Sequence, residues 1–175
     1  MRLFIAINFS DEIKAAAAKV RDQIKAAALR GRFSFDENLH LTLVFIGECS
    51  EAQASAIKKV LDDTVFSPFM LSFDTAGCFK REGGDTWWLG LRQSDALLAL
   101  QAKLSARLGQ SGFTLESRKY TPHITLGREV KMPAGYEPPK IASTEFGVTS
   151  IELMKSEYIN SKLTYTPICS KSAKV

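Results

Sequence analysis

The chain contains two histidines, and the same pattern follows each of them: an apolar residue, a threonine and another apolar residue. The two segments are residues 40–43 (His-Leu-Thr-Leu) and 123–126 (His-Ile-Thr-Leu). Successive side chains of a strand point to opposite faces, so each histidine shares a face with the threonine two residues later. The pattern predicts two strands that each present one imidazole and one hydroxyl, with their apolar side chains turned into a core.

Two imidazoles and two hydroxyls suit proton transfer at a phosphate. The unperturbed pKa of histidine lies near 6.5, so one ring can act as general base and the other as general acid. The hydroxyls of Thr42 and Thr125 can donate hydrogen bonds to non-bridging phosphoryl oxygens. The set favours in-line displacement at phosphorus. The residues alone do not say which of His40 and His123 is the acid.

The histidines have two other possible roles, in metal binding and in structure. A zinc site lacks a third ligand at any recognisable spacing, so no metal is expected. A purely structural role would suit one histidine on a strand, but packing does not require the same triplet twice. We therefore expect an enzyme whose active site is built around His40 and His123.

The rest of the chain predicts the elements that position these segments. Helices are expected from Ser10 to Gly31, after a capping box at Ser50 and Gln53, and from Ser94 or Asp95 to Gly109. In the second helix, Ala54, Ile57, Leu61 and Val65 are expected to face inward. Strands are expected at residues 2–7, 39–46, 69–79, 86–92, 113–117, 121–128, 146–154 and 163–169.

This order of elements indicates an α+β fold. We expect residues 1–175 to form a single domain of two pseudo-symmetric lobes, because the histidine segment occurs once in each half. The two antiparallel sheets would face a central groove, with the helices on the outside.

Length, charge and cysteine content set further bounds. A chain of 175 residues suits one domain, and a net charge of +4 permits a polyanionic partner without requiring one. No apolar run approaches the roughly 20 residues that span a bilayer, and the first strand is too short for a signal-peptide core. Three scattered cysteines fit no disulfide framework, so we expect a cytoplasmic protein.

Other side chains are candidates for contacts with phosphate or RNA. Arg128 follows the second histidine segment, but strict alternation from His123 places it on the opposite face, so a bulge is needed. The remaining candidates, each with a solvated or core alternative, are Lys80, Arg81, Arg118, Lys119, Tyr120, Phe33, Phe35, Trp87 and Trp88. The basic residues of the first helix, Lys14 among them, are expected to form a solvated face.

With these two histidine segments, the sequence resembles the two-histidine (2H) phosphoesterase superfamily, in its bacterial and archaeal RNA 2′,3′-cyclic phosphodiesterase branch, historically called 2′-5′ RNA ligase. The resemblance covers nearly the whole chain. The matching segments are residues 2–7, 38–48 (Asn-Leu-His-Leu-Thr-Leu-Val-Phe-Ile-Gly-Glu), 88–91, 122–128 (Pro-His-Ile-Thr-Leu-Gly-Arg) and 165–167.

The resemblance implies hydrolysis of a terminal 2′,3′-cyclic phosphate on RNA, or on a nucleotide, to a 2′-phosphate. It implies that His40 is the proton donor, that His123 is the proton acceptor, and that Thr42 and Thr125 hold the phosphate with Arg128 as a further candidate. No cofactor is implied, and we expect a monomer.

Two alternatives remain open from the sequence. Ligation that forms a 2′-5′ linkage, or cleavage of a 2′-5′ phosphodiester, would use the same site. A non-catalytic module that only grips RNA ends is the second alternative, although gripping a phosphate needs no matched acid and base.

Overall fold

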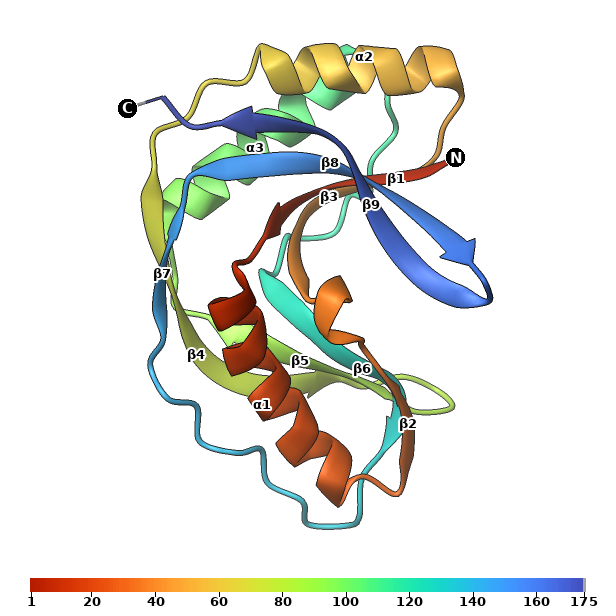
Figure 1. The fold of residues 1–175 in the computed structure, drawn as a ribbon, viewed down its shortest axis with the longest axis vertical. Helices are drawn as coiled ribbons and strands as arrows, with labels where there is room; N and C mark the ends of the chain where they lie inside the picture. The colour runs from red at the N-terminus through yellow and green to blue at the C-terminus, as the bar shows by residue number, and fades with distance from the viewer. Residues whose placement is uncertain (175) are drawn as a thin grey trace.

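Two antiparallel sheets organise residues 1–174, the part of the chain that the computed structural model describes (Figure 1). The strands are β1 (Arg2–Asn8), β2 (Arg30–Phe33), β3 (His40–Glu48), β4 (Phe69–Phe79), β5 (Asp85–Leu91), β6 (His123–Lys131), β7 (Glu145–Val148), β8 (Ser150–Ile159) and β9 (Lys162–Ser172). The small sheet has the order β3-β1-β8-β9, and the large sheet has the order β2-β6-β5-β4-β7.

The helices lie on the outer sides of the sheets (Figure 1). They are α1 (Asp11–Ala27), α2 (Glu51–Asp62) and α3 (Asp95–Gln110), and a short 3-10 helix, η1 (Asp36–Asn38), precedes β3. α1 contacts β2 and β6 of the large sheet, whereas α2 contacts β8 and β9 and α3 contacts β3 of the small sheet. The predicted α+β architecture of two antiparallel sheets with outer helices is confirmed.

Local signals at the helix starts behave as predicted. The hydroxyl of Ser10 accepts a hydrogen bond from the amide of Ile13, and that of Ser94 accepts one from the amide of Leu97. Ser50 and Gln53 form the full capping box, with both reciprocal hydrogen bonds present. Such caps satisfy amides that have no partner within the helix, and each contributes about 1 kcal/mol.

One hydrophobic core runs behind both histidine strands. Leu41, Leu43, Ile124 and Leu126 are buried in a cluster that also contains the inward faces of all three helices. Full burial of such a side chain stabilises the fold by roughly 1.5–3 kcal/mol. Each sheet therefore has a helix side, which is the core, and an opposite side, which we call the histidine side.

The first helix ends earlier than predicted. α1 stops at Ala27, and Gly31 lies inside β2, a strand that the sequence pattern did not reveal. A Cβ atom at Gly31 would lie 2.8 Å from Cγ2 of Val130 in the neighbouring strand β6. The glycine therefore serves close packing between β2 and β6 rather than helix termination.

Three other expectations were wrong in part. The run 146–154 forms two strands, because the chain leaves the large sheet after β7 and enters the small sheet at β8. Residues 113–117 form no strand, since they lead from α3 on the small sheet towards β6 in the large one. Val65 is exposed because α2 ends before it, and Val60 occupies the buried position instead.

Among residues 1–174, none of the helices has both the length and the apolar composition needed to cross a membrane.

Candidate active site

Each histidine is the first residue of its strand: His40 opens β3 in the small sheet, and His123 opens β6 in the large sheet. The two strands contact each other. In both, the histidine and the following threonine are half-buried, while the apolar residues between and after them are buried. The fold thus brings together Thr42 and Thr125 with the two imidazoles, one pair from each sheet.

The ring of His40 is held at both nitrogens. Its Nδ1 lies 2.7 Å from the carbonyl oxygen of Asn38, and its Nε2 lies 2.9 Å from the hydroxyl of Thr42. A carbonyl only accepts, so Nδ1 carries a hydrogen and donates it. In the neutral ring, Nε2 therefore accepts from the Thr42 hydroxyl, and it is the nitrogen that gains or loses the catalytic proton.

His123 repeats this arrangement. Its Nδ1 lies 2.7 Å from the carbonyl oxygen of Thr121, which again stands two residues before the histidine. The same reasoning assigns a hydrogen to Nδ1 and leaves Nε2 as the reactive nitrogen. Two histidines from different sheets are thus set in the same tautomer by the same local contact, so each has its Nε2 available for proton transfer.

Aromatic rings fix the planes of both imidazoles. The ring of His40 lies 5.0 Å from the rings of Phe4 and Tyr165, the latter edge-on. The ring of His123 lies 5.0 Å from that of Phe79, also edge-on. These contacts restrict ring rotation, so the reactive nitrogens keep their direction.

Burial lowers the pKa of both imidazoles in the free protein. The pKa of His40 is lowered to about 4, mainly by burial and also by the charges of Lys14, Arg128 and His123, while the hydrogen bond to Asn38 partly opposes the shift. The pKa of His123 is also lowered, first by burial, and a bound anion would act in the opposite direction on both.

The strand that carries His123 contains the bulge that Arg128 needs. Trp88 pairs with Thr125, but the preceding residue, Trp87, pairs with Gly127, so two steps along β6 match one step along β5. This irregularity reverses the alternation and returns Arg128 to the side of the sheet that carries Thr125.

The positive charge of Arg128 acts electrostatically on the groups at the centre of the site. It lowers the pKa of both histidines, and it opposes the burial that raises the pKa of Tyr165. The side chain itself is exposed. A cation between the two motifs, free to reach an anion, is well placed to hold a phosphoryl oxygen.

Several groups around the site gave little signal in the sequence. Lys14, expected on a solvated face, is half-buried and donates to the carbonyl of Glu37. The hydroxyl of Tyr120 donates a hydrogen bond of 2.9 Å to the carbonyl oxygen of Thr42, and this bond links the segment before His123 to the backbone of β3. Tyr165 had appeared only within a matching segment, and its contact with His40 depends on β9 pairing with β8.

Other candidates lie apart from the histidines or are already paired. Lys80 is paired with Asp85, and Arg118 with Glu116, although the charge of Arg118 still acts on His123. The exposed ring of Phe35 carries Lys162 Nζ 4.4 Å above it. Phe33 and Trp87 belong to the core.

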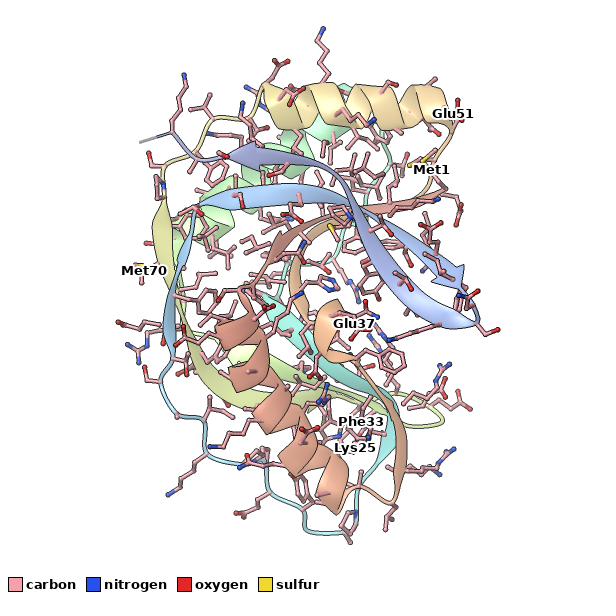
Figure 2. The ribbon with its side chains drawn as sticks, viewed as in Figure 1. Met1, Lys25, Phe33, Glu37, Glu51 and Met70 are labelled. Carbon is pink, nitrogen blue, oxygen red and sulfur yellow. The ribbon has the colours of Figure 1, made fainter. Side chains whose placement is uncertain are left out.

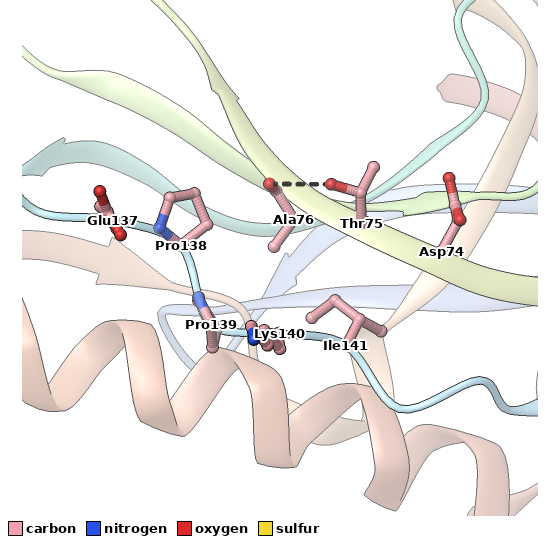
Figure 3. A pocket seen from close by; sticks show the side chains of 8 residues that line it. All are labelled: Asp74, Thr75, Ala76, Glu137, Pro138, Pro139, Lys140 and Ile141. Atoms are coloured by element: carbon pink, nitrogen blue, oxygen red, sulfur yellow. Dashed lines mark hydrogen bonds between the residues drawn. The ribbon is translucent and has the colours of Figure 1, made fainter.

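An open hollow elsewhere on the molecule is lined by none of the motif residues. It lies between residues 74–76 of β4 and residues 137–141 of the loop before β7, with α1 alongside (Figure 3). Its charged groups are Asp74, Glu137 and Lys140. Within residues 1–174, no three histidine, cysteine or carboxylate side chains gather as a metal-binding group. The two motifs remain the candidate site.

Comparison with known proteins gives one consistent family. Residues 9–157 match the model of the 2′-5′ RNA ligase superfamily. The chain is 32% identical over 169 residues to the RNA 2′,3′-cyclic phosphodiesterase of Thermotoga maritima, covering 95% of this chain and 89% of the relative. It is also 32% identical over 168 residues to the enzyme of that name from Escherichia coli, covering 95% and 93%.

Solved structures agree with the sequence comparison. E. coli LigT complexed with 3′-AMP superposes with a TM-score of 0.88 at 31% identity, covering 99% of this chain and 98% of that one. TT0787 of Thermus thermophilus gives a TM-score of 0.84 at 26% identity, covering 98% and 97%. The chain belongs to the 2′-5′ RNA ligase superfamily of two-histidine phosphoesterases.

Proposed function

We propose that this protein hydrolyses the terminal 2′,3′-cyclic phosphate of RNA, or of a nucleotide, to a 2′-phosphate. The single observation that carries the proposal is the matched setting of His40 and His123, each with Nδ1 bound to the carbonyl two residues earlier and Nε2 left for chemistry. The family membership and the relatives named RNA 2′,3′-cyclic phosphodiesterase support it.

In the proposed reaction, the hydroxyls of Thr42 and Thr125 and the guanidinium of Arg128 hold the non-bridging oxygens. Nε2 of His123 takes a proton from water as the water oxygen bonds to phosphorus. The bond from phosphorus to the 3′ oxygen breaks, and Nε2–H of His40 protonates that oxygen. The phosphate stays on the 2′ oxygen, and the exchange of one proton at each histidine balances the step.

The low pKa of His40 makes its proposed role depend on the substrate. The pKa of His40 is about 4, so its ring is neutral in the free protein at a pH above that value. The ring must therefore gain a proton when the phosphodiester anion binds beside it. Negative charge within contact distance raises the pKa of an imidazole. The substrate would therefore create the acid that its own cleavage requires.

The site is complete within one chain, which supports action as a monomer on RNA ends. Cys49, Cys78 and Cys169 are free thiols, which supports the proposal that the protein works in the reducing cytoplasm.

The first test uses a short RNA that ends in a 2′,3′-cyclic phosphate, incubated in the presence of EDTA. Chromatography then resolves the 2′- and 3′-phosphate products. We expect the 2′-phosphate alone, with the rate reduced at least about 100-fold in His40→Ala and in His123→Ala. Tyr158→Ala, an exposed residue at the β8–β9 hairpin, is the matched control. Unaltered RNA with the unmodified protein would contradict the proposal.

A second test assigns acid and base. Bis(p-nitrophenyl) phosphate releases a phenolate that needs little protonation, so a variant lacking the general acid should keep much of its activity on it. We expect this partial activity in His40→Ala and not in His123→Ala. The reverse result would exchange the two roles.

A further inference from the structure

The outer edge of the large sheet carries four exposed cations on two paired strands. β2, the edge strand, pairs with β6 so that Arg32 lies opposite Arg128 and Arg30 lies opposite Lys131 (Figure 1). All four side chains are exposed. We call these two directly opposed pairs the basic edge.

The basic edge lies on the histidine side of the sheet. A Cβ atom at Gly31 would lie 2.8 Å from Cγ2 of Val130, which is buried in the core. Since side chains alternate along a strand, the two arginines that flank Gly31 on β2 point away from the core. Their partners on β6 point the same way, because directly paired residues share a side of a sheet.

The pairing places like charges opposite each other. Such pairs destabilise a sheet, and here two successive pairs do so. Glu129 pairs with Arg32, and Arg30 donates a hydrogen bond of 2.8 Å to the carbonyl of Gly83. Within residues 1–174, no carboxylate forms an ion pair with the two cations on β6. The excess positive charge serves no purpose in folding, and a bound polyanion would neutralise it.

The basic edge is continuous with the candidate active site. Arg128 acts electrostatically on both histidines, and Lys131 is the last residue of β6. The strand from Thr125 to Lys131 spans about 20 Å, and the two opposed pairs lie about 7 Å apart on β2. An extended RNA backbone can place successive phosphates at such intervals. A strand held by its terminal phosphate at the histidines can therefore reach both pairs.

We propose that the basic edge binds phosphates of the RNA strand that precedes the cyclic phosphate. The inference rests on the proposed function, and it names an RNA strand of several nucleotides, rather than a free nucleotide, as the preferred substrate. Contacts from arginine and lysine to phosphate position a strand without reading its sequence, so the preference is for length and not for a base. RNA fits better than an acidic protein, because the charges follow a line that begins at the phosphate-binding group Arg128.

The kinetic test compares adenosine 2′,3′-cyclic phosphate with an octanucleotide that ends in a 2′,3′-cyclic phosphate. We expect the unmodified protein to have the higher kcat/KM on the octanucleotide. Arg30→Gln/Lys131→Gln should lose roughly 3- to 30-fold on the octanucleotide and nothing on the mononucleotide. Arg30→Lys/Lys131→Arg, which keeps both charges, should retain the preference. Lys58→Gln/Lys59→Gln, which removes two exposed charges from α2, is the matched control.

Equal kcat/KM of the unmodified protein on the two substrates would overturn the proposal. An equal loss on both substrates in Arg30→Gln/Lys131→Gln would also overturn it, as would the same selective loss in the control variant.

Equilibrium binding separates failure of the basic edge from failure of the proposed function. A fluorescent octanucleotide that ends in a 3′-phosphate is titrated by anisotropy, without turnover, from about 50 to 300 mM salt. Each phosphate contact on a single strand contributes about 0.7 to the slope of log Kd against log salt, so Arg30→Gln/Lys131→Gln should lower the slope by about 1.4. We expect no change in the control variant.

The binding result decides on the basic edge whether or not hydrolysis occurs. A lowered slope supports the edge even if the cyclic phosphate is not hydrolysed, and an unchanged slope rejects it even if the cyclic phosphate is hydrolysed. Loss of affinity for a polyglutamate peptide, with RNA binding unchanged, would overturn the proposal in favour of an acidic protein partner.

Discussion

At the scale of single residues, the site depends on where protons reside. The pKa of His40 is about 4, and that of His123 is lowered from its ordinary value. In the proposed mechanism, His123 must be neutral and His40 must be protonated. The neutral fraction of His123 falls only below its lowered pKa, whereas the protonated fraction of His40 falls as the pH rises through about 4.

These signs predict a bell-shaped profile for kcat/KM, with its maximum on the acidic side of 6.5, the ordinary imidazole pKa. The profile for kcat should lie at higher pH, because a bound phosphate anion raises the pKa of both rings. Initial rates between about pH 4 and 9 at constant ionic strength check both statements. A value of kcat/KM that rises steadily with pH would indicate attack by hydroxide instead.

Tyr120 offers a second residue-level prediction. Its hydroxyl donates to the carbonyl of Thr42, so Tyr120→Phe leaves that half-buried carbonyl without its partner. We expect the free energy of unfolding to fall by about 1 kcal/mol. Because the carbonyl belongs to a phosphate-binding residue, kcat should also fall severalfold. Tyr136→Phe, whose ring packs on Trp87 instead, should leave kcat unchanged. Equal effects of the two variants on kcat would rule out a positioning role.

At the scale of elements, the β8–β9 hairpin steadies the segment before His40. Asn38, which is buried, donates its amide to the carbonyl of Leu163 at 2.8 Å. Glu37, labelled in Figure 2, forms an ion pair with Lys162 on the same hairpin. The carbonyl of Asn38 in turn accepts the hydrogen bond from His40 Nδ1, so the hairpin positions the imidazole through this residue.

Asn38→Ala should therefore disturb catalysis without removing any catalytic group. The variant leaves the Leu163 carbonyl unpaired and frees the backbone that anchors His40. We expect kcat to fall about 10-fold, comparable to the effect of removing residues that orient metal-binding histidines, with KM little changed. Glu37→Gln, which weakens only the surface ion pair, is the control. A loss of stability with unchanged kcat in Asn38→Ala would reduce the hairpin to a purely structural role.

The elements also show how far the sequence predicts this fold. The helix starts were predicted because a cap and an amphipathic face are local signals, as at Ser50. The strands that begin at His40 and His123 were predicted because alternation is local too. The sequence did not reveal β2, because Arg-Gly-Arg-Phe becomes a strand only by pairing with β6. The side on which Arg128 lies depends on a bulge, which is a property of two paired strands rather than one segment.

At the scale of the whole molecule, the chain passes repeatedly between the sheets. The small sheet combines β1 and β3 from the start of the chain with β8 and β9 from its end. Its core and that of the large sheet belong to one cluster. We expect a single cooperative unfolding transition in urea, with fluorescence and circular dichroism coinciding. Two separated transitions would mean that the sheets unfold independently.

Acidic pH should lower the free energy of unfolding, because the active-site imidazole of His40 binds a proton less readily in the folded protein than in the unfolded chain. The pKa of His40 is lowered to about 4 by folding, against an ordinary value of 6.5. As the pH falls below 6.5, the unfolded chain binds the proton first, so the free energy of unfolding decreases until about pH 4 and then levels off. The contribution of this one group is at most about 3 kcal/mol, and the lowered pKa of His123 acts in the same direction.

Urea unfolding at about pH 7 and pH 4.5 measures this contribution in the unmodified protein and in His40→Asn. We expect the unmodified protein to lose more stability between the two conditions than the variant does, because asparagine has no proton to gain. Saturating adenosine 3′-monophosphate should reduce the difference, since a phosphate that raises the pKa of His40 in the folded state removes the cause of the loss. An identical pH dependence in both proteins would show that the imidazole takes its proton as readily in the fold as in the unfolded chain. The proposed coupling of substrate binding to protonation of the acid would then be lost.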